Sequence, residues 1–331
     1  MNGPRPLGSR PRRLDNGPRP LGSRPRRLGS RPRRLGNGLR RPRPSHGAWD
    51  RIRRHPAGLA GVAILGAIVL ACAIGPALSP YGPHETDLGA RNEGPSWAHP
   101  FGTAELGEDV LTRVLVAGRV SLAIGLATAL VATAVGTGLG LLAGWRGGWV
   151  DSAFARLTDL VLALPAFVLL IVLSLAFEQV GVLEVVLILS LLSWPLLFRL
   201  TRASALRTRE LPYVEAARAV GAGQGRILGR HLLPAAVPEV AAFAALAVGM
   251  AILAESALSF LSLGIDPGTD LSWGNLMIGA QDTIEERPWL TLFPGAFVLL
   301  AVLSVSLIGD AVRDALDPGA GPARAPRRWA P

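Results

Sequence analysis

A polar segment at 201–234 carries the residues whose types and spacing best fit a binding role. An acidic residue is followed by two alanines, a glycine and a Leu-Pro pair, at Glu215, Ala216, Ala217, Gly221, Leu233 and Pro234. The chemistry expected of such a pattern is non-covalent, because the segment would dock a partner protein rather than break a bond.

Local signals in this segment predict two short helices. Pro212 suits the first turn of a helix, and Glu215 lies near the positive end of its dipole. The two alanines keep this helix slim, and Gly221 ends it. A second helix is predicted over 224–232, closed by the Leu-Pro pair before the next apolar run. Such a pair of helices fits the groove of a partner protein, although an ordinary solvated connector would also explain it.

The composition excludes several kinds of chemistry. All 34 basic residues are arginine. A phosphate-binding P-loop needs a lysine beside its glycines, so ATP that drives this protein would be bound by another subunit. The single cysteine, Cys72, lies in an apolar run, and the five histidines are scattered without an HExxH pair. One thiol forms neither an internal disulfide nor a cysteine metal site. We therefore expect no catalytic residue, cofactor or metal, and no enzymatic activity.

Glu255 is an ionisable residue in the outer part of an otherwise apolar run. A charge at membrane depth is costly and faces protein or water, so it suggests a functional site. Glu255 would then line a translocation path. The alternative is a structural hydrogen bond to a neighbouring helix, and the sequence leaves both open.

Long charge-free runs must position these residues. Hydrophobic residues make up 50% of the 331 residues and charged residues 18%. A transmembrane helix needs about 20 apolar residues. Six runs are assigned to spans, at 57–79, 120–143, 154–177, 182–200, 238–261 and 292–308. The sequence therefore predicts an all-α polytopic membrane protein with about six transmembrane helices, the third kinked at Pro165.

A Gly-x-Gly-x-Gly run at 136–140 has two interpretations. A dinucleotide-binding loop would follow a strand and precede an acidic residue about 20 residues later. Neither context fits a charge-free run of this length. Small residues also let membrane helices pack closely, and we adopt that interpretation.

Arginine asymmetry predicts the topology. Residues 1–54 and 199–230 are rich in arginine, whereas 80–118 and 262–290 are acidic. Both termini are therefore expected in the cytoplasm. The predicted order begins with a disordered cytoplasmic tail (1–54), a first transmembrane helix (55–80) and an external segment (81–118). A five-helix core (119–312) follows, which contains a cytoplasmic loop (201–234) and an external loop (262–290). A short cytoplasmic tail (313–331) ends the chain.

The N-terminal tail is repetitive. Residues 2–14 recur as 16–28, with many arginines, prolines and glycines. Such a segment buries too little apolar surface to offset its ordering entropy. A basic tail can bind anionic lipid or nucleic acid. Because no aromatic residue precedes Trp49, we expect no specific binding of nucleic acid.

The Glu-Ala-Ala pattern with its glycine and Leu-Pro pair resembles the EAA loop of binding-protein-dependent ABC importer permeases. The resemblance extends over about 50–318 and is closest to the C-subunit type of dipeptide, oligopeptide and nickel permeases. Its motifs are HPFGTAELG at 99–107, DVL at 109–111, RVSL at 119–122, AGWRGG at 143–148, ALP at 163–165, SWP at 193–195, ESALSFL at 255–261, SWGN at 272–275 and DALDP at 314–318. Two positions depart from the family pattern: Glu108 replaces a usual Arg, and Ser262 a usual Gly.

This resemblance implies a type I ABC importer permease fold in the inner membrane. It implies a second homologous permease subunit, two cytoplasmic ATPase subunits that grip the EAA loop, and an external solute-binding protein. The solute would be a dipeptide or oligopeptide, or nickel or a related small solute. A secondary transporter or channel that acts without an ATPase is the alternative. It would need paired intramembrane charges or inverted repeats. The sequence shows one intramembrane charge, Glu255, and no obvious repeat.

Overall fold

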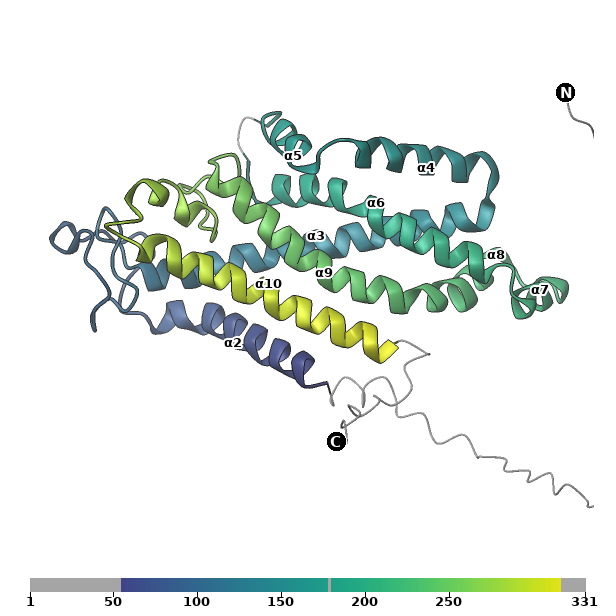
Figure 1. The fold of residues 1–331 in the computed structure, drawn as a ribbon, viewed down its shortest axis with the longest axis horizontal. Coiled ribbons are helices and arrows are strands. Elements are labelled where there is room, and N and C mark those ends of the chain that lie inside the picture. The colour runs from purple at the N-terminus through teal and green to yellow at the C-terminus, as the bar shows by residue number, and fades with distance from the viewer. Residues whose placement is uncertain (1–54, 178–179, 317–331) are drawn as a thin grey trace, which may run out of the picture. The chain divides into compact units, whose positions relative to one another are not determined.

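The computed structural model describes residues 55–177 and 180–316, which belong to one compact unit, His46–Pro331. In this part of the chain regular structure is helical, apart from an isolated β-bridge between Thr103 and Asp109. The long helices lie side by side in an elongated bundle (Figure 1). The tail predicted at 1–54, and most of the one predicted at 313–331, lie outside the described residues.

Five described helices are long and apolar enough to cross a membrane, and a bent pair adds up to one more. The five are α2 (Pro56–Leu78), α3 (Val110–Arg146), α6 (Val182–Thr208), α9 (Leu233–Phe260) and α10 (Trp289–Leu316). The bent pair, α4 (Gly148–Ala163) and α5 (Ala166–Ser174), turns by 88° at Leu164 and Pro165. The predicted all-α fold with about six spans is confirmed, and so is the break at Pro165.

Helix α3 packs against α6 through closely spaced glycines. A Cβ atom added at Gly136 would lie 2.6 Å from the Leu197 Cβ, and one added at Gly140 would lie 2.8 Å from the Phe198 carbonyl oxygen. Gly138 faces open space. The prediction that this run packs helices is confirmed for two of its three glycines, and the dinucleotide interpretation is wrong because the run lies inside a long helix.

Several helices are longer than the predicted spans. Helix α3 begins at Val110, inside the segment predicted as external at 81–118, because the Asp109 side chain accepts a hydrogen bond from the Thr112 amide at 2.8 Å and caps the helix. Helix α6 continues to Thr208. The predicted loop 201–234 therefore starts inside α6, and its remainder holds α7 (Pro212–Ala219), α8 (Gln224–Ile227) and the π-helical turn η2 (Leu228–Leu232).

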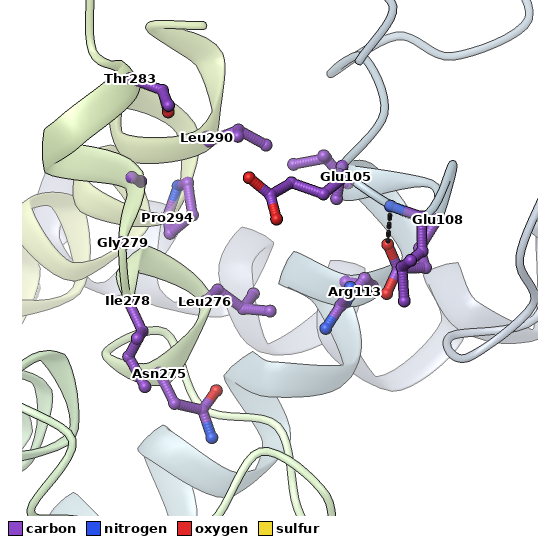
Figure 2. Close-up of a pocket in the computed structure, with 14 residues that line it drawn as sticks. Glu105, Glu108, Arg113, Asn275, Leu276, Ile278, Gly279, Thr283, Leu290 and Pro294 are labelled. Carbon is purple, nitrogen blue, oxygen red and sulfur yellow. Dashed lines mark hydrogen bonds and ion pairs between the residues drawn. The ribbon is translucent and has the colours of Figure 1, made fainter. Parts of the chain in front are cut away.

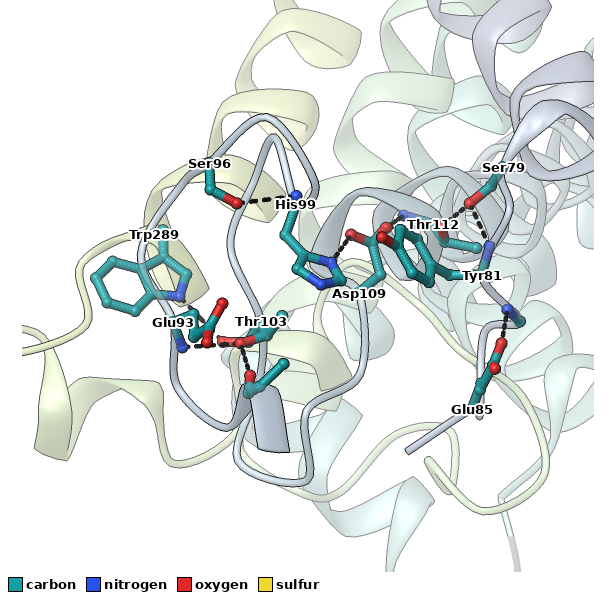
Figure 3. Close-up of polar contacts among 12 residues, drawn as sticks. Ser79, Tyr81, Glu85, Glu93, Ser96, His99, Thr103, Asp109, Thr112 and Trp289 are labelled. Carbon is teal, nitrogen blue, oxygen red and sulfur yellow. Dashed lines mark hydrogen bonds and ion pairs between the residues drawn. The ribbon is translucent and has the colours of Figure 1, made fainter. Parts of the chain in front are cut away.

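A hydrogen-bond network joins the end of α2 to the start of α3 (Figure 3). The hydroxyls of Ser79 and Thr112 lie 2.6 Å apart, and the Thr112 hydroxyl also bonds Asp109 at 2.7 Å. On its other side, Asp109 lies 3.0 Å from Nδ1 of His99, which is buried. This network fixes the segment that contains η1 (Leu88–Ala90) at the end of the bundle opposite α7, which we call the far end.

The segment predicted as an external loop at 262–290 folds back into the bundle at the far end. Its short helices are η3 (Asn275–Met277) and η4 (Ala280–Thr283). Leu271 and Trp273 are buried in a core cluster with residues of α2, α3 and α10. The Trp273 indole nitrogen donates to the Val114 carbonyl at 3.0 Å. The segment is therefore part of the packed core and not a free loop.

Ser262, just after α9, has a left-handed backbone with φ of 60°. A side chain strains this conformation, which glycine adopts freely. We expect Ser262→Gly to stabilise the protein by about 1 kcal/mol. The measurement is the thermal midpoint in detergent, and Ser306→Gly, inside α10, should lower it because glycine weakens a helix. An unchanged or lower midpoint for Ser262→Gly would contradict this expectation.

Helix α2 contains Pro76, and Arg119 of α3 compensates for it. Proline lacks the N–H that would bond the carbonyl four residues earlier, which here belongs to Cys72. The Arg119 Nε donates to that carbonyl at 2.8 Å, and its terminal nitrogen donates to the Ala73 carbonyl at 2.9 Å. Arg119 therefore ties α2 to α3 at the point where the proline interrupts the helix.

We expect Arg119→Leu to destabilise the protein less when Pro76 is replaced by alanine. An alanine at this position restores the missing N–H, so the Cys72 carbonyl no longer depends on the arginine. The coupling between the two substitutions should be about 1 kcal/mol. It is measured as a double-mutant cycle of thermal midpoints, and equal effects of Arg119→Leu in both backgrounds would refute the compensation.

Candidate functional site

Helix α7 begins and ends as the sequence predicts. Pro212 is its first residue, and Gly221, with φ of +82°, follows its end. The Gly221 amide donates to the Arg218 carbonyl at 2.9 Å, and the Ala222 amide donates to the Ala217 carbonyl at 3.0 Å. This pair of bonds is a Schellman motif, which needs a left-handed residue at the glycine position.

Helix α7 is anchored to the bundle through Val214 and Arg218. Val214 is fully buried and packs in a cluster with Ala205, Ile227 and Leu232. The Arg218 guanidinium lies 4.3 Å from the ring centroid of Trp145, close enough for a cation–π contact. These contacts hold α7 beyond the ends of α6 and α9 (Figure 1), at what we call the α7 end of the bundle.

The other side of α7 is not covered by any of the described residues. Glu215 and Ala216 are exposed, and Ala217 is half-buried. Two larger apolar side chains are also exposed nearby, Tyr213 at 49% and Val220 at 84%. Exposed apolar groups beside a charge, on a rigid protruding helix, form a surface suited to a partner protein.

Leu233 and Pro234 do not close the second short helix, and that prediction is wrong. They are the first residues of α9, and the helix runs on from α8 through η2 into α9. The Leu233 amide donates to the Leu228 carbonyl in a widened turn. Proline is tolerated in the first turn of a helix. The pair thus connects the α7 region to a span.

Glu255 is fully buried in α9. Its carboxyl oxygens accept hydrogen bonds from the hydroxyls of Ser121 at 3.1 Å, Ser259 at 2.9 Å and Ser256 at 3.4 Å. Ser121 belongs to α3, and its oxygen also accepts from the Trp273 amide at 3.1 Å. The side chain therefore bridges α3, α9 and the folded-back segment.

The far end carries a cavity of about 270 Å³ between the start of α3 and the 275–294 region (Figure 2). Glu105, Glu108 and Arg113 lie on one side of it, and Asn275 and Leu276 lie on the other. Glu108, one of the two residues that depart from the family pattern, pairs with Arg113 at 2.5 Å. Among residues 55–177 and 180–316, no three His, Cys, Asp or Glu side chains gather as a metal site.

Sequence reasoning missed the polar contacts between helices. Arg202 of α6 pairs with Asp151 of α4, and Arg199 pairs with Asp159 at 2.5 Å. The sequence places Arg202 in the loop at 201–234, whereas Asp159 and Arg199 fall inside the predicted spans 154–177 and 182–200. A signal was present, since acids and arginines recur on two runs joined by a short connection, but pairing them required the helix geometry.

Comparison with known proteins identifies the family. The model for "Binding-protein-dependent transport system inner membrane component" matches residues 136–321, and that for "N-terminal TM domain of oligopeptide transport permease C" matches 43–95. A putative peptide permease protein of Brucella suis is 39% identical over 273 residues, 82% of this chain and 90% of the relative. The dipeptide transport system permease protein DppC of Alkalihalophilus pseudofirmus is 34% identical over 275 residues, 83% of this chain and 90% of the relative.

A third relative is the glutathione transport system permease protein GsiD of Pectobacterium atrosepticum. It is 38% identical over 273 residues, which is 82% of this chain and 89% of the relative. The family match covers more than half of the chain, and each of these relatives aligns along most of it. This chain is therefore a multi-pass inner-membrane protein that belongs to the permeases of binding-protein-dependent ABC importers.

Proposed function

We propose that this permease imports peptides and that α7 couples it to a cytoplasmic ATPase. The relatives are named as permeases for peptides, dipeptides and glutathione, which are solutes with peptide bonds. The observation that carries the coupling role is the shape of α7. Its buried side is fixed to the bundle through Val214, and its free side presents Glu215 on a protruding helix.

The charge distribution supports the predicted orientation, with the α7 end in the cytoplasm. The α7 region carries Arg209, Arg218, Arg226 and Arg230, whereas the segments at the far end are mainly acidic. Arginine near the ends of membrane helices favours the cytoplasmic side. Both termini would then be cytoplasmic, because the first end of α2 and the last end of α10 are the ends that point toward the α7 side of the bundle (Figure 1).

The remaining partners follow from this orientation. Two ATPase subunits would bind the α7 surfaces of this chain and of a second homologous permease subunit. An external solute-binding protein would dock on the far end, where the acidic segments and the cavity of Figure 2 lie. ATP binding would close the ATPases, move α7 and shift the spans between inward- and outward-open forms.

The experiment tests α7 directly. We expect Glu215→Ala and Gly221→Ala to reduce peptide uptake at least about 10-fold, with normal insertion. The first removes a charge from the docking face, and the second strains a backbone with positive φ, at a cost of about 1–2 kcal/mol. Uptake is measured in cells, and ATPase binding by co-purification.

Matched controls lie close to both positions. Glu210→Ala removes an exposed acid outside α7, and Gly229→Ala adds a methyl group in open space without a positive φ. Both should transport normally. Wild-type uptake by Glu215→Ala together with full ATPase binding would count against the coupling role. Solute transport by the purified chain without any ATPase would favour a secondary transporter or channel.

A further inference from the structure

Helix α4 has an exposed surface divided into two parallel stripes. Both follow the spacing i, i+4, i+7, i+11, which places residues on one face of a helix. The polar stripe consists of Ser152, Arg156, Asp159 and Ala163, all exposed. The apolar stripe consists of Ala153, Leu157 and Leu160, which are also exposed, and exposed Leu164 follows at the bend after the helix. Lipid tails suit the second stripe, whereas the first contains two charged residues.

The charges of the polar stripe lie some distance along the bundle from the start of α4. Asp159 is eleven residues after Gly148, and at a rise of 1.5 Å per residue that is about 16 Å along the axis. Asp159 pairs with Arg199 of α6 at 2.5 Å, yet the two side chains remain 66% and 50% exposed. Charged groups inside the hydrocarbon region face water or protein rather than lipid. The polar stripe is therefore not a lipid-facing surface.

The same surface continues along α6 toward the α7 end. Arg199, Ala203 and Arg207 follow one another at intervals of four residues, and all are exposed. Arg207 pairs with Glu239 of α9 at 2.8 Å, again with both side chains largely exposed. Ala203, Arg207 and Glu239 also line a cavity of about 590 Å³ between α6, α9 and α10.

We infer that the polar stripe of α4 and the Arg199–Ala203–Arg207 face of α6 form the wall of a water-filled vestibule, which is this subunit's part of the exit path for the solute. The inference rests on the proposed function and goes beyond it by assigning the residues. The wall presents paired charges of both signs, so it repels neither the ammonium group nor the carboxylate of a peptide. A second permease subunit seated on this surface would instead bury the two ion pairs.

Cysteine labelling of the assembled transporter in inside-out vesicles tests this wall. Replacing the native Cys72 by alanine gives a background without thiols in this chain, because it contains one cysteine. Cysteine is then placed at Ala163 or Ala203 on the wall, and at Leu160 on the apolar stripe, one turn from Ala163. We expect a charged, membrane-impermeant thiol reagent to label the wall positions at least about 10-fold faster than position 160.

Two results would overturn the inference. Equally slow labelling at all three positions would place the wall against lipid or packed protein. Absence of labelling at position 203, together with a disulfide formed under an added oxidant between that position and a cysteine introduced in the second permease subunit, would make the surface a subunit interface. The labelling is repeated in variants that also carry Glu215→Ala, which separates this test from the test of α7. Water reaches the wall in the absence of nucleotide whether or not α7 couples the permease to the ATPase. Normal labelling with normal uptake in that variant would reject the coupling role and leave the vestibule intact.

Discussion

Replacing Gly140 by leucine is expected to separate α3 from α6 and to remove most of the folded protein from the membrane. Even a single added Cβ would lie 2.8 Å from both the Phe198 carbonyl oxygen and the Thr201 Cβ. The backbone of α6 cannot move aside without also losing its contacts at Gly136 and Gly144, which are equally tight. Overpacking of this kind costs about 1–3 kcal/mol or more. The measurement is the yield of monodisperse protein in mild detergent, together with the thermal midpoint.

Gly138 provides the matched control on the same helix. Apart from its chain neighbours and the backbone of its own helix, no atom of the described residues lies within 4 Å of a Cβ added there. Gly138→Leu should therefore fold, and Gly138→Ala should raise stability by up to about 1 kcal/mol because glycine is a poor helix former. Similar losses at 138 and 140 would mean that helix propensity or lipid contact, not the α3–α6 contact, decides the outcome.

Glu255→Ala is expected to destabilise the far end of the bundle by about 3 kcal/mol, because it removes the acceptor of three hydroxyl groups and leaves a cavity. The Ser121 hydroxyl, which holds the Trp273 amide, would lose its own partner. The folded-back segment should then loosen, and its hydrogen exchange should increase around Trp273. The thermal midpoint and hydrogen exchange measure these two effects.

Conservative variants decide between the two roles left open for Glu255. Glu255→Gln keeps an oxygen acceptor and should lose only about 1 kcal/mol, and Ser259→Ala should have an effect of similar size. Across Glu255→Ala, Glu255→Gln and Ser259→Ala, the loss of uptake should then parallel the loss of thermal stability. If Glu255→Gln abolished uptake at wild-type stability, the residue would act in the translocation path, and a packing role would be rejected.

The sequence by itself determined the elements that depend on local physics. Charge-free runs of span length, the break at Pro165 and the end of α7 at Gly221 all follow from hydrophobicity or from backbone restrictions of single residues. The sequence also predicts that the glycine run packs against another helix, because small residues in a membrane helix let a neighbouring helix approach closely. These features need no knowledge of which helix lies beside which.

Only the tertiary structure decided the lengths of the helices and the partners of the polar groups. Helices α3 and α6 extend through charged residues that the sequence places outside the spans. Arg119 of α3 donates to backbone carbonyls of α2, and Arg202 of α6 pairs with Asp151 of α4, so each charge has a partner within the bundle. Glu255 accepts a hydrogen bond from Ser121, which lies 134 residues earlier in the sequence. The burial of Trp273 likewise required a segment between two spans to fold back into the bundle. Such contacts depend on the relative placement of distant helices, which hydrophobicity along the chain does not encode.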